Sequence, residues 1–185
     1  MVSVFSLWLA ILLSAVAVFI VSSIIHMMLK YHQSDFSQVP NEDAVMDSLR
    51  PFNIPPGDYY TPYAGSMEAM KDPAYQDKLN QGPKIVMTVM PNGPGNMGKS
   101  LGLWFVYSIV VGIFVAWVGA RTLPAGAEYG EVFCVAALVA FAGYGLALLQ
   151  GSIWWGKKWS ATLKSVIDAL VYALVTAGVF GWLWP

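Results

Sequence analysis

Long uncharged apolar stretches alternate with polar ones along this chain, and four of them are long enough to cross a lipid bilayer. Residues 2–29 hold no Asp, Glu, Lys or Arg, and at about 1.5 Å per helical residue they exceed the ~30 Å hydrocarbon core. The other stretches are residues 101–120, 132–149 and 163–184. Because an unpaired strand cannot satisfy its backbone in lipid, all four are predicted to be helices. The pattern predicts an all-α membrane protein built as a four-transmembrane-helix bundle.

The composition agrees with lipid surroundings. The chain is 57% hydrophobic and 11% charged, whereas an ordinary soluble domain is about 25% charged. We therefore expect a single membrane domain over residues 1–185. The net charge of −1 gives no electrostatic basis for binding nucleic acid. A cleavable signal peptide is not expected, because nothing basic precedes the first stretch, which is about twice the usual signal length.

The basic residues predict the orientation. All except Arg121 lie in or beside the first and third loops between the predicted spans. Lysine and arginine are retained in the cytoplasm, so both termini should be periplasmic and loops 1 and 3 cytoplasmic in a bacterial inner membrane. The tryptophans fit this orientation, since indoles favour the membrane interfaces. Those expected at the inner interface are Trp104, Trp154, Trp155 and Trp159, and those expected at the outer one are Trp8, Trp117, Trp182 and Trp184.

Small residues recur every fourth position in the last predicted span, and this spacing places them on one helix face. Lipid supplies no hydrophobic drive between helices, so small side chains let two backbones approach closely and gain packing contacts. The predicted helix-packing face consists of Ser165, Ala169, Ala173, Ala177 and Gly181. Whether it meets a helix of the same chain or of a second copy is left open.

The polar segment of residues 31–99 is rich in Pro, Gly, Asp and Tyr, and is predicted to be a mostly irregular cytoplasmic segment. Asn41 and Asp72 are candidate helix caps, and Pro73 suits a first helical position. The expected elements are a helix over 41–50, an irregular stretch over 53–65, a helix over 72–82 and an isolated strand over 84–90.

Residues 93–100, Gly-Pro-Gly-Asn-Met-Gly-Lys-Ser, match the phosphate-loop pattern G-x-x-x-x-G-K-S. In nucleotide hydrolases this loop needs a parallel sheet beneath it and a magnesium-binding acid on another strand. The short polar segment cannot supply either, so nucleotide hydrolysis is not expected. A flexible hinge is the simplest interpretation. Gly98, Lys99 and Ser100 remain a candidate contact for a phosphate of membrane lipid.

His26 and Asp168 are the polar residues inside the predicted spans that most need partners. Both lie near the predicted inner membrane boundary, and ionisable groups at such a depth usually face protein. With Lys164 they form a candidate intramembrane polar network. It would act either as an interhelical clasp or as a proton-handling or substrate site, and the clasp is favoured because both residues can reach interfacial water.

No residues are assigned to catalysis, to a cofactor or to a metal. The chain has no Ser, His and acid spacing typical of a hydrolase. His26 and His32 would lie on different faces of a straight helix, and the lone Cys134 is predicted nearer the opposite side of the membrane. Tyr144 and Gln150 are expected to be interhelical hydrogen-bond donors.

Three features together resemble small bacterial inner-membrane families with four spans and no assigned function. These are Ser22-Ser-Ile-Ile-His26 in the first span, the Gly151-Ser-Ile-Trp-Trp-Gly-Lys-Lys-Trp159 turn, and the helix from Asp168 to Trp184 ending at Pro185. The resemblance covers the helical frame better than the polar segment. It implies no activity and transfers no functional residues.

The leading hypothesis is a non-catalytic membrane module: an accessory or assembly subunit, or a self-associating bundle. It rests on the small-residue face and on the lack of a catalytic pattern. Its expected partners are lipid and either further copies of the chain or a larger membrane complex. The alternative is a small transporter or channel that uses the polar site near His26 and Asp168, and an intramembrane enzyme ranks third.

Overall fold

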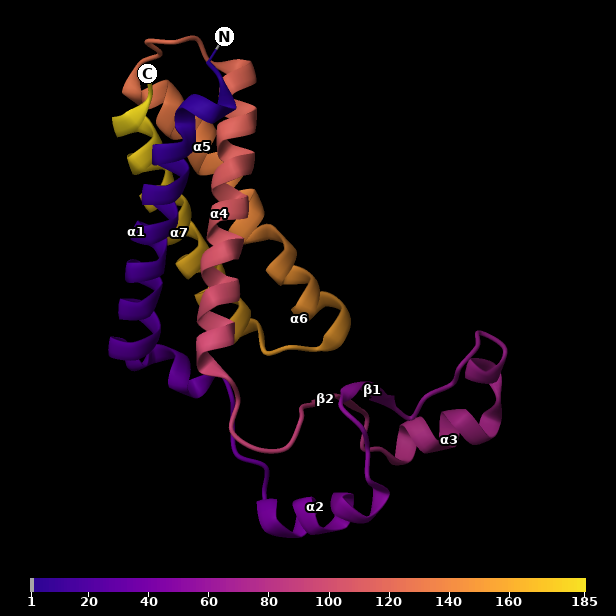
Figure 1. Cartoon of the computed structure of the whole chain (residues 1–185). Helices are drawn as coiled ribbons and strands as arrows, with labels where there is room; N and C mark the ends of the chain where they lie inside the picture. Colours follow the sequence, from indigo (N-terminus) through magenta and orange to yellow (C-terminus); the bar gives the residue numbers. More distant parts are fainter. Residues whose placement is uncertain (1) are drawn as a thin grey trace. The chain divides into compact units, whose positions relative to one another are not determined.

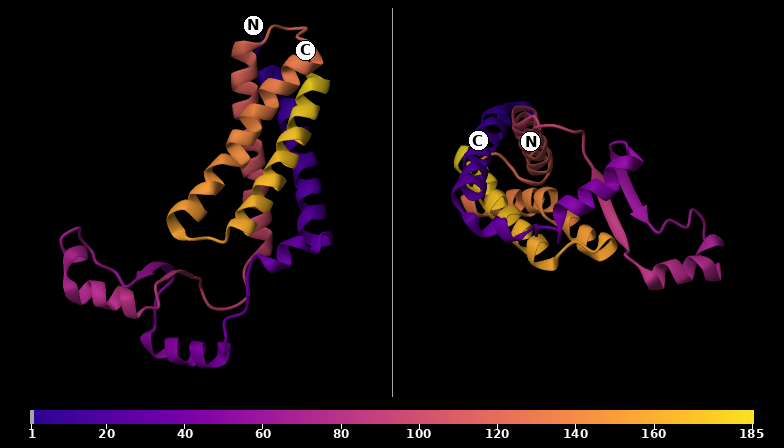
Figure 2. Two further views of the ribbon diagram at one scale, coloured as in Figure 1. Left: turned by 180° about the vertical axis from the view of Figure 1, so that it is seen from behind. Right: turned by 90° about the horizontal axis from the view of Figure 1, so that it is seen from below.

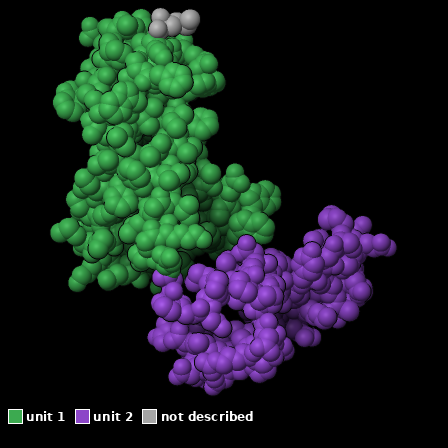
Figure 3. Space-filling model, in the orientation of Figure 1, with its two compact units in different colours: residues 1–37, 96–185 green, residues 38–95 purple. Residues whose placement is uncertain are grey.

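The computed structural model describes residues 2–185, which divide into two compact units (Figure 3). The membrane unit comprises the chain up to Ser37 together with Asn96–Pro185, and the polar unit comprises Gln38–Gly95. The polar unit falls within the predicted segment of residues 31–99. Each unit is described separately below.

The membrane unit is a bundle of helices (Figures 1 and 2). Within residues 2–185, four helical stretches are long and apolar enough to span a bilayer: Val4–Met28, Met97–Thr122, Tyr129–Trp155 and Trp159–Leu183. The chain is therefore an integral membrane protein, and the predicted all-α four-helix bundle is confirmed. Both termini lie at the same end of this unit (Figure 1).

Three of the spanning helices begin at residues other than the predicted ones. A short 3-10 turn, Val4–Leu7, precedes α1 (Trp8–Met28). Helix α4 (Met97–Thr122) begins earlier than predicted because the Asn96 side chain accepts a hydrogen bond from the backbone N–H of Lys99. Helix α7 (Trp159–Leu183) also begins earlier than predicted, next to the basic pair that precedes it.

The third predicted span is not one continuous helix. It consists of α5 (Tyr129–Tyr144), a 3-10 turn (Leu146–Leu148) and α6 (Leu149–Trp155). At the break, a Cβ on Gly145 would lie only 3.1 Å from the Cβ of Ala169, so a glycine lets α7 approach there. Gly156, with φ of 66°, ends α6 in the left-handed conformation that favours glycine.

The predicted packing face of α7 lies against α5 of the same chain. Helix α7 packs more extensively on α5 than on any other described element. Gly145, directly after α5, meets the face at Ala169, and the ring of Tyr129 covers it at Gly181, where a Cβ would lie 2.7 Å from the ring. Between these ends Ala173 and Ala177 are fully buried, whereas Ser165 and Gly181 are half-buried. The partner that the sequence left open is thus an intramolecular one.

Helices α1 and α4 also approach closely. A Cβ on Gly112 of α4 would lie 3.5 Å from the Cα of Ile11, so the two backbones nearly touch there. Ala10, Ser14 and Val18 of α1 are buried in the bundle. The hydrophobic effect does not drive helices together in lipid. Close contacts such as these stabilise the bundle through dispersion instead.

Two of the eight tryptophans face the protein interior. The Trp104 indole N–H donates to Ser22 Oγ at 2.9 Å, and the Trp184 N–H donates to the backbone carbonyl of Pro124 at 2.9 Å. The Trp184 ring also covers Gly119. The other six indoles are exposed, as interface anchors would be.

The polar unit contains a two-stranded sheet that the sequence did not predict. Strand β2 (Ile85–Val89) pairs antiparallel with β1 (Gly57–Thr61), with Gly57 opposite Val89. The prediction of an isolated strand was therefore wrong, since the stretch expected to be irregular supplies its partner. Thr88 donates a hydrogen bond to the Asp58 carboxylate across the pair at 2.6 Å.

Two helices complete the polar unit, α2 (Glu42–Leu49) and α3 (Pro73–Gln81). The Asp72 cap is confirmed, because its carboxylate accepts the backbone N–H of Ala74 at 2.8 Å. The predicted helix start at Asn41 is confirmed, since α2 begins at the next residue, although Asn41 adopts the left-handed conformation and its side chain makes no capping bond. Two acidic residues in the first turn complement the helix dipole instead.

Placing a larger side chain on the α7 packing face tests whether α7 packs against α5 through this face. Replacing Ala173 by Leu should lower the stability of the bundle by about 1–3 kcal/mol, because a fully buried alanine leaves no room for a larger side chain. Ala142→Leu, on the exposed side of α5, is the matched control and should change stability by less than about 0.5 kcal/mol. Thermal unfolding in detergent, followed by tryptophan fluorescence, measures both. Equal losses would show that α7 does not pack through this face.

Candidate functional site

The most polar part of the membrane unit lies where α1 ends, at the end of the bundle away from the termini (Figure 1). Helix α1 stops at Met28, Leu29 is extended with ψ of 119°, and a 3-10 turn, η2 (Lys30–Ser34), follows. The turn redirects the chain toward α7, where its side chains meet Asp168. Without this break they would continue along the helix axis, away from α7.

Asp168 is the buried centre of this site, with only 3% of its surface exposed. The His32 Nε2 lies 2.7 Å from its Oδ2, and the Tyr31 hydroxyl donates to its Oδ1. Both carboxylate oxygens therefore have protein partners. A buried carboxylate requires such partners, because leaving it unpaired in a low-dielectric environment is costly.

His32 bridges two carboxylates. Its Nδ1 lies 2.6 Å from Asp35 Oδ2, while its Nε2 faces Asp168. Each ring nitrogen of His32 therefore faces a carboxylate, and Asp35 is also bonded by Lys164. We call Tyr31, His32, Asp35, Lys164 and Asp168 the clasp.

Lys164 ties η2 to α7 through all three of its donors. Its Nζ donates to the Tyr31 carbonyl at 2.5 Å, to Ser34 Oγ at 2.8 Å and to Asp35 Oδ1 at 2.8 Å. The Lys164 ammonium, followed by the hydrogen bond from His32, holds the pKa of Asp35 below its ordinary value. Asp35 therefore stays ionised at neutral pH.

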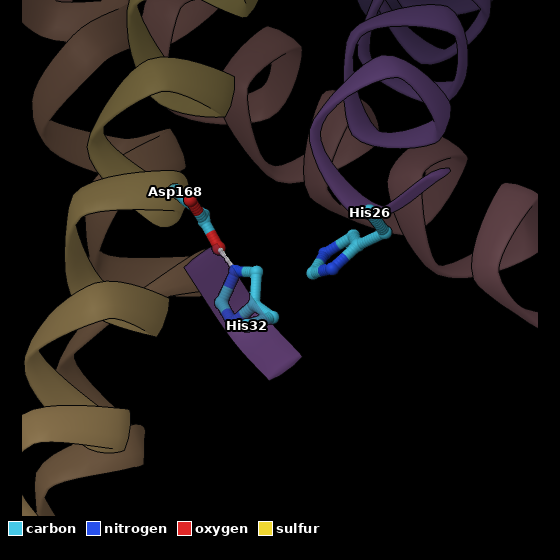
Figure 4. A group of neighbouring side chains, drawn as sticks. All are labelled: His26, His32 and Asp168. Atoms are coloured by element: carbon cyan, nitrogen blue, oxygen red, sulfur yellow. Dashed lines mark hydrogen bonds and ion pairs between the residues drawn. The ribbon is translucent and has the colours of Figure 1, made fainter. Parts of the chain in front are cut away.

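His26 lies beside the clasp, on the last turn of α1 (Figure 4). Its ring centroid is 4.7 Å from that of His32, and its Nε2 lies 3.2 Å from the Tyr172 hydroxyl. One possible ligand atom from each of His26, His32 and Asp168 lies within 4.8 Å of the other two. The expectation that the two histidines lie on different faces was wrong, because it assumed a straight helix through Leu29.

A layer of aromatic rings lies next to Asp168 and its neighbours in the bundle. Trp104, Tyr107, Tyr144 and Tyr172 come from three helices and contact one another with centroids 5.6 to 6.0 Å apart. Tyr107 donates to the Gly143 carbonyl at 2.6 Å. The Tyr144 hydroxyl is buried and has no hydrogen-bond partner among residues 2–185, contrary to its expected role as an interhelical donor. Gln150 is exposed.

Each member of the predicted network of His26, Asp168 and Lys164 has hydrogen-bond partners, but these partners are other residues. Asp168 bonds to His32 and Tyr31, and Lys164 bonds to Asp35, so no direct bond joins the three predicted members. The missed residues occur in the run Tyr-His-Gln-Ser-Asp directly after the first span. The cluster of polar side chains next to a predicted membrane boundary is the sequence feature that could have indicated them.

The candidate phosphate contact occupies the first turn of α4. The backbone N–H of Lys99 is bonded to Asn96 Oδ1 at 2.9 Å, and that of Ser100 to the Asn96 carbonyl at 3.2 Å. Two of the helix-start donors are thus already satisfied by protein. Gly98 lies between them and the cap, and the Lys99 side chain is exposed. A lipid contact through Lys99 stays a prediction.

The clasp can hold two segments together, share a proton between His32 and Asp168, or present imidazole and carboxylate ligands to a cation. No protein-family model, curated protein or solved structure matches this chain. The resemblance to four-span inner-membrane families of unassigned function stays a prediction.

A double-mutant cycle tests whether the Lys164–Asp35 pair stabilises the bundle. The two side chains are only 23% and 13% exposed, so their coupling should be about 1 kcal/mol, above that of a solvent-exposed pair. Asp35→Asn, Lys164→Gln and the double variant would be compared by thermal unfolding in detergent. Lys158, which donates to the Ser34 carbonyl at 2.9 Å, gives the control cycle with Asp35 and should show a clearly smaller coupling. Equal coupling in both cycles would contradict the assigned pairing.

Proposed function

We propose that this chain is a non-catalytic membrane module, an accessory or assembly subunit whose helical bundle anchors the polar unit at the membrane. The observation that carries this proposal is that the polar unit has no buried residue between Gln38 and Gly95. Every residue of Gln38–Gly95 is exposed or half-buried, although the unit contains two helices and a sheet. A two-stranded sheet without a core is marginally stable alone, so such a unit needs a surface to pack on.

Helix α2 offers the clearest apolar surface of this unit. Val45, Met46 and Leu49 are 38%, 48% and 43% exposed, and Phe52 directly after the helix is 72% exposed. The spacing of Val45 and Leu49 places them one turn apart on the same face. Clustered exposed apolar side chains on a segment outside the spans favour binding to a protein or a membrane surface.

The membrane unit supports an anchoring role over transport. The ionisable side chains beyond the C-terminal end of α1 bond to those in the N-terminal half of α7, and His26 bonds to Tyr172. The small-residue face that suggested self-association is used within the chain, against α5. Assembly is therefore assigned to the polar unit, and the transporter hypothesis, which would use His26 and Asp168, is the weaker proposal.

The proposed location is a bacterial inner membrane, with both termini periplasmic and the polar unit cytoplasmic, as the distribution of basic residues favours. Cysteines introduced singly at Tyr63, Ala125 and Lys157, in a Cys134→Ser background, test this orientation with a membrane-impermeant maleimide on intact cells. All three positions are exposed. Only the cysteine at Ala125 should react before the cells are opened. Reaction at Tyr63 or Lys157 in intact cells would reverse the proposed orientation.

Purification in mild detergent tests the accessory role. The chain should bring down one recurrent membrane complex, and Leu49→Asp should reduce its recovery at least about tenfold by placing a charge in the apolar face. Ser48→Asp adds the same charge about 100° away around α2 and should leave recovery unchanged. Unchanged thermal unfolding of the bundle in both variants confirms that only the contact was altered. A chain that purifies alone, or a complex that survives Leu49→Asp, would contradict this role.

A further inference from the structure

We propose that His26, His32 and Asp168 bind a divalent transition-metal ion of the Zn²⁺ type. Two imidazoles and one carboxylate suit Zn²⁺ and its first-row neighbours, whereas Mg²⁺ and Ca²⁺ prefer oxygen ligands alone. The inference adds a ligand to the clasp region. It does not depend on the accessory role, since a metal site can form in a membrane module of any function.

The geometry is close to that of a bound ion. Their possible ligand atoms lie within 4.8 Å of one another, and a tetrahedral ion with bonds of about 2.0–2.1 Å would hold them about 3.4 Å apart. His32 and Asp168, now 2.7 Å apart, would separate by less than about 1 Å to admit the ion. The exposed His26 ring, at the end of α1, would complete the set by a small rotation.

Each ligand already has a neighbour that orients it. Asp35 Oδ2 lies 2.6 Å from His32 Nδ1, the Tyr31 hydroxyl donates to the second oxygen of Asp168, and the Tyr172 hydroxyl lies 3.2 Å from His26 Nε2. Carboxylates and hydroxyls around metal-binding histidines commonly fix the ring and raise its basicity. Lys164 in turn holds Asp35 at 2.8 Å. With Nδ1–H donating to Asp35, the Nε2 lone pair of His32 is left for the ion.

Ion binding replaces a proton. Without metal, one proton lies between His32 Nε2 and Asp168 Oδ2, which are 2.7 Å apart, and when the ion enters, that proton leaves to solvent while His32 and Asp168 each form a bond to the metal. His26, on the last turn of α1, is the exposed member of the three ligands. Three protein ligands leave a fourth position for water or another small ligand.

Metal titration of the full-length chain tests the site. The protein is purified in mild detergent through a tag without histidine, stripped with a chelator and titrated with ZnCl₂ by calorimetry. One ion should bind per chain. Asp168→Asn and His32→Gln should each weaken binding at least about 100-fold, more than the loss expected for an orienting neighbour alone. Asp77→Asn, an exposed aspartate of α3, should bind like the unchanged protein.

Co²⁺ absorption gives a readout that a purely structural role would not produce. His26→Cys, in a Cys134→Ser background, should add a thiolate-to-cobalt charge-transfer band in the near ultraviolet, because the thiolate becomes a ligand. His26 is exposed, so this variant should fold even if changes at Asp168 do not. Failure of the unchanged protein to bind Zn²⁺ and Co²⁺, binding that persists in Asp168→Asn and His32→Gln, or absence of the band would each overturn the proposal. None of these results bears on partner recovery through α2, so the two proposals fail separately.

Discussion

A buried carboxylate near the end of a membrane-spanning helix has to be paired, and the pairing of Asp168 accounts for much of what surrounds it. Its two oxygens are bonded by Tyr31 and His32, which lie beyond the end of α1. They can reach α7 only because α1 stops at Met28 and the chain turns. The cost of leaving the carboxylate unpaired thus favours an early end to α1, although no glycine or proline is present there to impose it.

The rest of the bundle is subject to a different constraint: in lipid the hydrophobic effect does not drive the helices together, so they must associate through close packing. A glycine lies at each of two close crossings, Gly145 beside Ala169 and Gly112 beside the backbone of Ile11, and lets the backbones approach. Aromatic rings fill the wider space near the clasp, where Trp104 contacts Tyr144 and Tyr172. Dispersion between closely packed atoms is what holds helices together in lipid, so close crossings and large rings are complementary solutions.

The spans were predictable because their signal is long and physical: about 20 apolar residues in a row admit few other structures. The α7 packing face was also visible, since its four-residue repeat follows from helix geometry alone. Only part of the clasp was predictable from the sequence. Asp168 and Lys164 stood out as polar residues inside an apolar run, but His32 and Asp35 depend on a turn with no local breaker, so sequence spacing placed the two histidines on different faces. Strand β1 was missed for a similar reason, because its pairing with β2 is a non-local contact in a Pro-rich stretch.

The clasp lies close in sequence to the start of the polar unit. Asp35 is bound by His32 and Lys164, and the polar unit begins at Gln38, so the clasp fixes the last part of the membrane unit before the chain leaves it. The bond between His32 and Asp168 is the one that a metal ion would replace. Exchanging a proton for an ion there changes the charge and the spacing of groups only a few residues before the polar unit. A bound ion would therefore act within the membrane unit, on the contacts that tie η2 to α7.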